Sequence, residues 1–450
     1  MDEPTEADIA AFHRVVGLLR DLPVEHPARL RAERVAASFA RDGRDRRRKA
    51  RNRAAAEADA ALKAATATGG AGRVPDLPLA ETGVTGELAR PLRCYVCKLP
   101  FHRIDGFYHL LCPDCAADNT ARRTARTDLA GRRVLLTGGR VKIGFELALM
   151  LLRDGADLTV TTRFPADAAR RFAAAPGHAD WADRLHIAAL DLRDPRQVVA
   201  LADRLLSDGR PLDALVNNAA QTLRRPPESY AALASAEAGS AAIGWRAPGF
   251  AVPGPDTPSV EGPGVDLPSL DLAVLDPAVL DPAGLVPDTA AANSWSAVLG
   301  GLDPAETLEA YLVNAFAPVL LCDRLLPLLL ASEHPRRYIV NVTAVEGRFA
   351  VRHKTPRHPH TNMAKAALNM LTRTSGPHLA ERGVHMCAVD TGWITDENPA
   401  PIRERSAARG FRTPLDVVDG AARVYDPIVR GEAGHPVSGV FLKDYQEAPW

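Results

Sequence analysis

The sequence predicts an α/β protein with a doubly wound parallel sheet, preceded by a helical arm and a small cysteine module. Three observations support this fold class. From Arg132 onward, seven apolar runs alternate with segments of helical periodicity. A glycine-bearing turn, LLTGGRVKIG, joins the first run to a helix. Four of the six cysteines lie within residues 94–115. Strands that alternate with helices typically form a parallel sheet with helices on both faces.

The first 67 residues predict a helical arm. Residues 5–67 are rich in Ala, Arg, Glu and Leu, with glycine only at Gly17 and Gly43, and this composition favours helices. We expect two helices with a break near DLPVEHPARL. Residues 41–53 carry eight basic and two acidic side chains, which we interpret as a solvated helix face. Nucleic-acid binding through residues 41–53 and 93–126 stays an alternative. We do not expect nucleic acid as a partner.

The chain of 450 residues is electrically balanced, with 55 basic and 55 acidic side chains. A net charge of zero provides no general attraction to nucleic acid or to a membrane surface. We identify no apolar stretch that approaches the roughly 20 residues a membrane span needs. The N-terminus MDEPTEADIAAF is acidic and lacks the order of a signal peptide. We therefore expect a cytoplasmic protein without a membrane segment.

Residues 68–127 predict a linker followed by a metal-binding module. The stretch TGGAGRVPDLPLAETG has the composition of a linker. Cys94 and Cys97 form one CxxC pair, and Cys112 and Cys115 form a second pair fourteen residues later. Each pair directs two thiolates at one ion, so the four cysteines predict a closed tetrahedral zinc site. Such a site has no open position for water, which indicates a structural role, although knuckles of this kind also bind protein partners.

Residues 128–450 predict the α/β domain. Its seven strand-like runs are RVLLTG, LTVTTR, LHIAALDL, ALVNNAA, RYIVNVTA, VHMCAVD and VSGVFL. A proline-rich segment, about residues 223–304, separates the fourth run from the fifth and contains the degenerate repeat LDLAVLDPAVLDPAGLVPD. A compact sheet does not need so long a connection. We interpret it as an insertion at the edge where such sheets bind ligands. A lid, a partner-binding arm and a variable surface loop are all compatible with it.

The turn LLTGGRVKIG has the context of a dinucleotide-binding turn, because it follows an apolar strand and opens an amphipathic helix. Gly138 allows the chain to turn sharply, and Gly144 allows the helix to pack close to the sheet. The helix N-terminus then presents free N–H groups and the positive end of its dipole to a pyrophosphate.

With these motifs in this order, residues 131–445 resemble the short-chain dehydrogenase/reductase family, which has a Rossmann-like fold. The family's TGxxxGxG turn appears as TGGRVKIG. Lys142 replaces the middle glycine, which is similar to the pteridine-reductase branch and suggests an added contact to phosphate. The resemblance implies that this turn binds the cofactor through Thr137, Gly138, Arg140, Lys142, Ile143 and Gly144.

The resemblance also implies cofactor contacts beyond the turn. Arg163 follows the second strand, where an acidic residue would bind the ribose of NAD and an arginine suits the 2′-phosphate of NADP(H). We therefore expect NADP(H), with Arg140 sharing that charge, and keep NAD(H) as an alternative. The other positions that the family pattern implies are Asp191, Leu192, Asn218, Ala219, Lys365, Gly392 and Thr395.

The family's catalytic positions are matched in part. Asn314 and Lys365 stand where the family has its Asn and Lys. Thr361 stands four residues before Lys365, where the family has its catalytic Tyr. Ala344 aligns with the family's Ser, with Thr343 beside it.

A threonine hydroxyl has a far higher pKa than a phenol and is a poor general acid. The expected reaction therefore needs another proton donor near Thr361. The loop before it holds three histidines, and His360 is our candidate. Asp390 is a second titratable group near the expected nicotinamide. The three histidines are His353, His358 and His360.

Two functions are compatible with this pattern. The first is a divergent NADP(H)-dependent oxidoreductase that transfers hydride to an unknown carbonyl- or imine-type substrate. The second is a catalytically impaired NADP(H)-binding scaffold or sensor that acts through protein partners, bound by the cysteine module or the insertion. Because family members commonly form dimers or tetramers through the helices that carry Asn314 and Lys365, we also expect a homo-oligomer.

Overall fold

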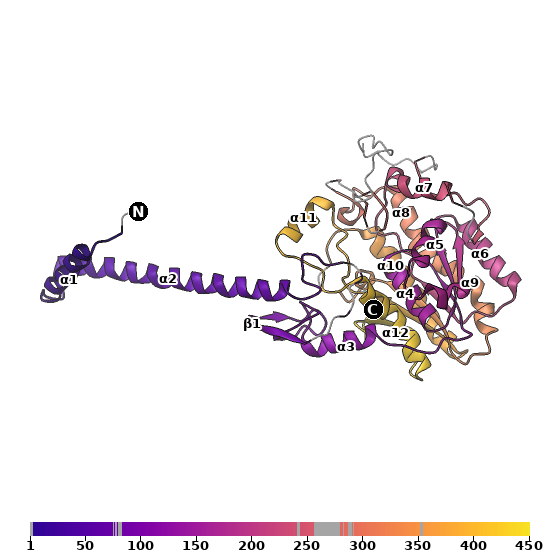
Figure 1. The fold of residues 1–450 in the computed structure, drawn as a ribbon, viewed down its shortest axis with the longest axis horizontal. Coiled ribbons are helices and arrows are strands. Elements are labelled where there is room, and N and C mark those ends of the chain that lie inside the picture. Colours follow the sequence, from indigo (N-terminus) through magenta and orange to yellow (C-terminus); the bar gives the residue numbers. More distant parts are fainter. Residues whose placement is uncertain are drawn as a thin grey trace.

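The computed structural model describes residues 3–450 except 75, 77, 78, 80–82, 241–243, 256–279, 282, 287–289, 291, 352 and 353. It shows an α/β body, a small module packed against that body, and a helical arm that projects away from both (Figure 1). Two helices form the arm, α1 (Glu6–Arg20) and α2 (Pro27–Ala64), where the sequence predicts two. Neither helix contains a buried residue among those described.

The body is organised around a nine-stranded sheet with the order β11-β10-β9-β8-β6-β3-β4-β5-β7. All neighbouring strands are parallel except β10 and β11. The chain order reverses on either side of β3, so the predicted doubly wound sheet is confirmed. The seven predicted runs form β3 (Arg133–Leu136), β4 (Asp157–Thr162), β5 (Leu185–Ala189), β6 (Ala214–Asn217), β8 (Arg337–Thr343), β9 (Val384–Asp390) and β10 (Val440–Lys443).

Helices cover both faces of the sheet and bury two separate cores. In β3, Val134 and Leu136 belong to one core and Leu135 to the other, because successive side chains of a strand point to opposite faces. One core includes side chains of α4 (Lys142–Arg153), α5 (Pro165–Ala173) and α12 (Val417–Glu432). The other includes side chains of α6 (Pro195–Asp208), α9 (Ala317–Leu330) and α10 (Pro359–Ala380).

One sequence-based expectation needs correction. The segment Pro304–Leu330 is long and apolar enough to cross a membrane by composition, with a mean hydropathy of 1.6 in its most apolar window. It comprises α8 (Pro304–Tyr311), a π-helical turn (Leu312–Phe316) and α9. Within the fold, 56% of that window is buried, and Leu321 and Leu325 of α9 belong to the second core. Its apolar character therefore serves the packing of α9 against the sheet.

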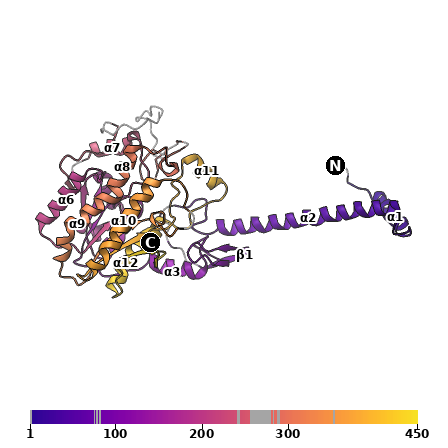
Figure 2. The ribbon, with the colours of Figure 1, turned by 180° about the vertical axis from the view of Figure 1, so that it is seen from behind.

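The cysteine module is small and has its own core. It contains the antiparallel strands β1 (Val84–Arg93) and β2 (Pro100–Asp105), followed by α3 (Pro113–Arg123). The module lies beside α12 at the base of the arm, as the view from behind also shows (Figure 2). Its core residues Phe107, Tyr108 and Leu111 pack with Leu415 of the body. The module and the body thus share one apolar cluster.

The described parts of the insertion are packed on the body. Helix α7 (Ala231–Ala238) contacts α5, and β7 (Trp245–Arg246) adds a parallel edge strand beside β5. Strands as short as β7 and β11 (Gln446–Ala448) have too few residues to show a period, so the sequence analysis did not predict them. Most of the degenerate repeat lies outside the described residues, which do not include 256–279.

Candidate functional site

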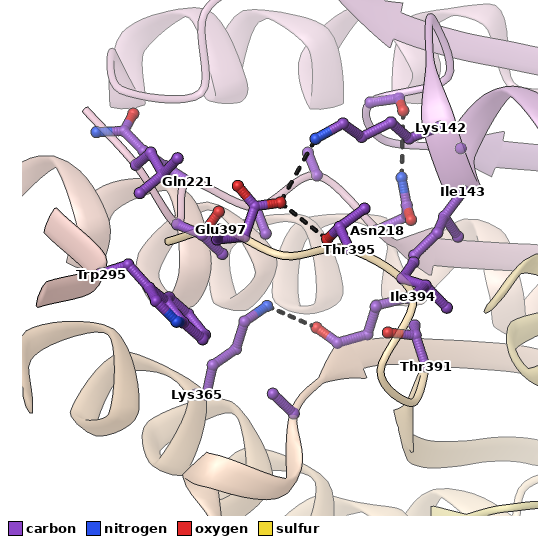
Figure 3. Close-up of a pocket in the computed structure, with 18 of the residues that line it drawn as sticks. Lys142, Ile143, Asn218, Gln221, Trp295, Lys365, Thr391, Ile394, Thr395 and Glu397 are labelled. Atoms are coloured by element: carbon purple, nitrogen blue, oxygen red, sulfur yellow. Dashed lines mark hydrogen bonds and ion pairs between the residues drawn. The ribbon is translucent and has the colours of Figure 1, made fainter. Parts of the chain in front are cut away.

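A cavity of about 910 Å³ opens at the carboxyl ends of the parallel strands. It is lined by the turns that follow β3, β4, β5, β6, β8 and β9, together with α10 and part of the insertion (Figure 3). The edge formed by the carboxyl ends of strands is where doubly wound sheets bind ligands.

The glycine turn after β3 has the close packing that its sequence predicts. Gly138 has a φ of +72°, a conformation that favours glycine. A Cβ on Gly144 would lie 1.9 Å from the Gly138 carbonyl oxygen, so no larger residue fits there. The Asn218 amide donates hydrogen bonds to the carbonyl oxygens of Thr137 (3.0 Å) and Gly138 (3.2 Å). The Thr137 hydroxyl accepts from the backbone N–H of Ala219 at 3.0 Å. These bonds hold the turns after β3 and β6 together on one side of the cavity.

Two arginines lie on the β4 side of the cavity, and their surroundings differ. The Arg163 guanidinium lies 5.9 Å from the ring centre of Phe164 and 5.1 Å from that of Tyr230. The Arg140 guanidinium is buried and contacts the Asp167 carboxylate at 2.5 Å. The same carboxylate also pairs with Arg170 and Arg171, so three guanidinium groups share it. Arg140 thus has a carboxylate partner inside the protein, whereas the contacts of Arg163 are aromatic and leave its charge available to a ligand phosphate.

Asp191 and Leu192 follow β5 and line the cavity beside Arg163. The Asp191 carboxylate accepts a hydrogen bond of 2.7 Å from the Arg193 guanidinium. This ion pair fixes the carboxylate at the cavity wall.

Lys142 meets an unexpected partner across the cavity. Its ammonium lies 3.5 Å from the Glu397 carboxylate, and the Thr395 hydroxyl donates to the same carboxylate at 2.9 Å (Figure 3). Ile143 and Gly392 line the same cavity. All the predicted cofactor positions except Thr137 thus line this cavity, and Lys142 is joined to the loop that follows β9.

The Lys365 ammonium lies at the opposite end of the cavity. This side chain is 4% exposed, and its Nζ donates a hydrogen bond of 2.9 Å to the Val342 carbonyl oxygen. Burial lowers the pKa of Lys365 to about 8. The Thr343 hydroxyl lines the cavity and donates to the Lys365 carbonyl oxygen at 3.4 Å.

Asn314 lies outside the cavity lining, in the π-helical turn between α8 and α9. Its side-chain oxygen accepts from the Gln221 N–H at 2.7 Å, and its amide donates to the Gln221 carbonyl oxygen at 2.8 Å. This paired contact holds the loop after β6. Asn314 is therefore a positioning residue for the cavity wall in this structure.

The structure does not place Thr361 and His360 in the cavity. Both side chains are buried, and the Thr361 hydroxyl has no hydrogen-bond partner among the described residues. The His360 ring lies 3.8 Å from the Glu306 carboxylate of α8. Because α10 begins at Pro359, both side chains lie on its first turn, where the His360 ring faces α8. His358 does line the cavity, stacked on Trp295 at 3.9 Å, and His353 lies outside the described residues.

Asp390 lies at the same end of the cavity as Lys365. The strand register places Thr343 of β8 and Lys443 of β10 on either side of it. One carboxylate oxygen accepts from the Val345 N–H at 3.0 Å. Burial raises the pKa of Asp390 to about 6, despite the opposing charge of Lys443. A carboxyl group of this kind titrates close to neutral pH.

Sequence reasoning missed several cavity-lining residues, among them Tyr95, Lys98, Trp295, Glu397 and Lys443. Trp295 belongs to the insertion, and Tyr95 and Lys98 belong to the cysteine module. No local motif connects these segments to the sheet, so no signal in the sequence places them in the cavity.

The four predicted metal ligands are gathered in one cluster. The Sγ atoms of the four cysteines lie within 4.8 Å of one another, and those of Cys97 and Cys112 are 3.7 Å apart. Sulfur atoms around a tetrahedral zinc ion with Zn–S bonds of about 2.3 Å are separated by roughly 3.8 Å. The donor set and its spacing fit zinc, held by Cys94, Cys97, Cys112 and Cys115.

Several known proteins are similar to this chain. The NADPH-bound carbonyl reductase from chicken fatty liver covers 72% of this chain and 100% of its own, with a TM-score of 0.46 and 19% identity. An uncharacterized protein of Acanthamoeba polyphaga mimivirus is 29% identical over 354 residues, which are 74% of this chain and 71% of that protein. A short chain dehydrogenase/reductase of Macrophomina phaseolina is 36% identical over 101 residues, 22% of this chain and 57% of that protein.

Two family profiles match successive parts of the body. The short chain dehydrogenase profile matches residues 132–237, and the profile described as enoyl-(acyl carrier protein) reductase matches residues 282–415. The first match contains the glycine turn, Arg163 and Asn218, and the second contains Asn314, Lys365 and Gly392. The chain therefore belongs to the short-chain dehydrogenase/reductase family of NAD(P)-dependent oxidoreductases.

Proposed function

We propose that the protein is an NADP(H)-dependent oxidoreductase that transfers hydride between the cofactor and a carbonyl- or imine-type substrate. One observation carries the proposal. A single cavity combines the dinucleotide-binding turn at one end with the buried Lys365 and Asp390 at the other. This arrangement suits a cofactor that spans the cavity with its reactive ring near Lys365.

The preference for NADP(H) over NAD(H) rests on Arg163. Its guanidinium is positioned by Phe164 and Tyr230 and lines the cavity where the second ribose would lie. Arg140 contributes less than the sequence implies, because its guanidinium is buried and held by the Asp167 carboxylate. An arginine at this strand end favours a 2′-phosphate.

We assign the proton of the reaction to Asp390. When bound, the nicotinamide would supply or accept hydride. Lys365 would hold the ribose of the cofactor at this end of the cavity. The Ser and Tyr positions of the family are Ala344 and Thr361, and neither offers a hydroxyl to the cavity. The Asp390 carboxyl, with its raised pKa, replaces them as the proton donor for carbonyl reduction.

The zinc site has a structural role in this proposal. Four cysteines complete the coordination of one ion, so no position stays open for water or substrate. The ion would hold together the turns around Cys94 and Cys112 in a module with a small core.

A second function, an NADP(H)-binding scaffold or sensor, is favoured by one observation. Ala344 and Thr361 remove both hydroxyl groups with which the family handles its proton. If Asp390 does not replace them, the cavity still binds the cofactor and the arm and cysteine module are left to contact partners.

The deciding experiment is a titration of the full chain with NADPH and with NADH, followed by energy transfer from tryptophan, since Trp295 lines the cavity. Binding is then followed by assays of NADPH oxidation with panels of carbonyl and imine compounds. NADPH binding with oxidation supports the enzyme, and NADPH binding without any oxidation supports the scaffold. A chain that binds neither nucleotide overturns both proposals.

Two glycine variants control the titration. Gly144→Ala places a Cβ 1.9 Å from the Gly138 carbonyl oxygen and should abolish nucleotide binding. Gly17→Ala, in the arm, has no atom within 4 Å of the added Cβ and should bind as the unaltered chain does.

We also propose a homodimer formed through the π-helical turn, α9 and α10. Phe316, Met363 and Met370 are 46%, 56% and 55% exposed on these elements. Burial of such side chains would stabilise an assembly. Light scattering should show a dimer that Met363→Glu dissociates. Phe39→Glu, on the exposed arm, should leave it intact, and a dimer lost only with Phe39→Glu would place the interface on the arm instead.

A further inference from the structure

The cysteine module contributes side chains to the cavity of the α/β body. Tyr95 and Lys98, from the turn that carries Cys94 and Cys97, both line it. The backbone of Lys98 has a φ of +63°. Its ammonium group lies 4.7 Å from the centre of the Tyr95 ring. The Lys443 ammonium of β10 lies 5.7 Å from the centre of the same ring. The module therefore forms part of the wall at the reaction end, next to Asp390 and Lys443.

Tyr95 makes a direct bond to the loop that follows β9. Its hydroxyl oxygen accepts a hydrogen bond of 2.8 Å from the backbone N–H of Trp393. Gly392, the preceding residue, has a φ of +79°, and a Cβ there would lie 3.5 Å from the same hydroxyl. The loop continues to Thr395 and Glu397, which reach into the cavity. A single phenol thus anchors the start of a loop that supplies several cavity contacts.

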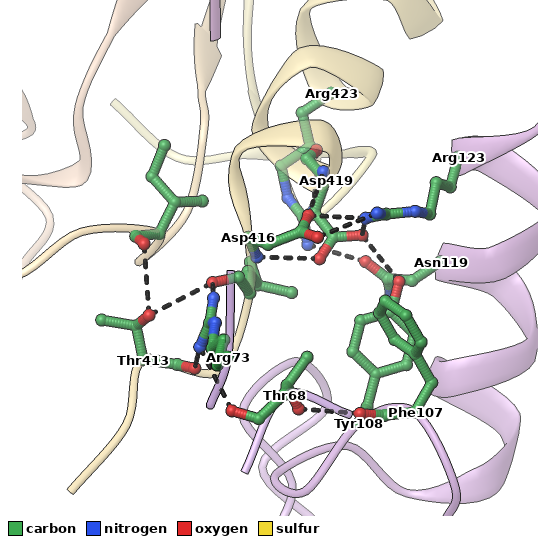
Figure 4. Close-up of polar contacts among 12 residues, drawn as sticks. Thr68, Arg73, Phe107, Tyr108, Asn119, Arg123, Thr413, Asp416, Asp419 and Arg423 are labelled. Atoms are coloured by element: carbon green, nitrogen blue, oxygen red, sulfur yellow. Dashed lines mark hydrogen bonds and ion pairs between the residues drawn. The ribbon is translucent and has the colours of Figure 1, made fainter. Parts of the chain in front are cut away.

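A buried polar network fixes the module to the body (Figure 4). The Arg123 guanidinium of α3 contacts the Asp416 carboxylate at 2.5 and 2.8 Å and the Asp419 carboxylate at 3.2 Å. The Tyr108 hydroxyl donates to Asp419 at 2.6 Å. The Arg423 guanidinium of α12 donates to the Asn119 side chain of α3 at 2.9 Å.

All six of these residues are at most 6% exposed. Charged groups that are buried in matched pairs hold a defined geometry, because separating them leaves a charge uncompensated. The module is therefore held in one orientation, in which Tyr95 faces the cavity.

We propose that the cysteine module is a structural wall of the reaction cavity, and that Tyr95 is a positioning residue that couples metal binding to the loop after β9. The backbone of Tyr95 is held by its N–H bond to the Leu110 carbonyl oxygen at 2.8 Å and by the cysteine turn on either side. Metal bound by the four cysteines joins these two segments. Its loss frees Tyr95 and, through it, the loop of residues 391–398.

The proposal rests on the proposed function for its cofactor readout, but a second readout is independent of it. Hydrogen exchange of the peptide covering residues 391–398 reports the loop directly. In the zinc-loaded full chain, Tyr95→Phe removes the acceptor for the Trp393 N–H. We expect exchange in this peptide to become at least about threefold faster, the NADPH dissociation constant to rise about threefold to tenfold, and the melting temperature to stay within the error of the unaltered chain.

Chelation of the metal should produce the same loop exchange in the unaltered chain, and added Zn²⁺ should reverse it. Tyr338→Phe is the matched control, because it removes a phenol that donates to Glu432 at 2.6 Å, outside the cavity lining. It should leave the loop exchange unchanged.

Unchanged exchange at residues 391–398 in both Tyr95→Phe and the chelated chain would overturn the proposal. Failure of the unaltered chain to bind NADPH would overturn the proposed function instead, and the exchange result would still decide the role of Tyr95. A large fall in melting temperature with Tyr95→Phe would show a general structural role and also overturn it.

Discussion

The two ends of the cavity differ in how closely their residues follow the family pattern. At the end beside β3 and β4, Gly138, Gly144 and Asn218 keep the family pattern, and the Asn218 amide bonds to the backbone carbonyl oxygens of the glycine turn. At the end beside β8 and β9, the Ser and Tyr positions are Ala344 and Thr361, and other segments of the chain provide the polar groups. Phosphate binding needs a backbone geometry, whereas proton transfer needs a titratable group within reach of the substrate.

The comparison teaches that a binding end and a reaction end can diverge independently. A change in the glycine turn would disturb the packing of β3 against β6, as the 3.0 Å approach of a Gly138 Cβ to Ala219 shows. Thr361 on α10 lies outside the cavity lining, and its hydroxyl makes no hydrogen bond to the glycine turn or to any other described residue, so a change there does not act on that packing. In the proposed function, the Asp390 carboxyl would take the place of the missing phenol.

The sharpest test of the reaction end is Asp390→Asn. Because a positioned proton donor contributes roughly 10²–10⁴ in rate, we expect turnover to fall by about that factor while NADPH binding is retained. Asp390 donates in its protonated form, so kcat/KM should be constant below about pH 6 and fall tenfold per pH unit above it. The variant should lose this pH dependence. Glu346→Gln, at a second cavity carboxylate whose charge helps to raise the pKa of Asp390, should keep turnover and move the pH dependence to lower pH. An equal loss of turnover there would remove the special role of Asp390.

Lys365→Met addresses the same end with a smaller effect. We expect turnover to fall about 10²–10³, as for the removal of one preorganised electrostatic group. The melting temperature should not fall, because the pKa lowered to about 8 shows that burial disfavours the charged amine. Lys354→Met changes an exposed lysine of the cavity lining and should lower turnover by less than about threefold. Retained turnover in Lys365→Met would show that the reaction does not depend on the ammonium group at the family's Lys position.

Arg163→Glu tests the other end. Removal of a charge-assisted contact to phosphate should weaken NADPH binding about 10-fold to 100-fold, with little change for NADH. Arg196→Glu on α6, at a side chain that is 90% exposed, is the matched charge reversal and should change neither affinity. Equal weakening of both nucleotides by Arg163→Glu would contradict the assignment to a 2′-phosphate.

Tyr230→Phe should have the smallest effect. Its hydroxyl lies 3.5 Å from the Arg163 guanidinium, at the limit of a hydrogen bond, while the ring remains beneath the charge at 5.1 Å. We expect less than about a threefold change in the NADPH dissociation constant, measured by the same titration. A larger loss would mean that the hydroxyl, and not the ring, positions Arg163.

The parts of the site that follow one another along the chain could be predicted from the sequence. The strand, glycine turn and helix around Gly138 are local, and so are the two CxxC pairs. The pairing of Lys142 with Glu397 and of Tyr95 with Trp393 joins residues more than 250 positions apart. Contacts at such separations depend on how whole elements pack, and no period or spacing encodes them. His360 illustrates the limit, because its neighbour His358 lines the cavity while His360 packs toward α8.

The sequence by itself determined the order of the strands and helices, the dinucleotide-binding turn and the set of four clustered thiols. Each of these depends on residues that are close in the chain, where steric and periodic rules apply directly. Only the tertiary structure decided that the cysteine module faces the cavity, that Asp390 lies between Thr343 and Lys443, and that Thr361 does not reach the cavity. Those outcomes depend on the register of neighbouring strands and on the buried Arg123–Asp416 contact, which bring distant segments together at a cost that local sequence does not reveal.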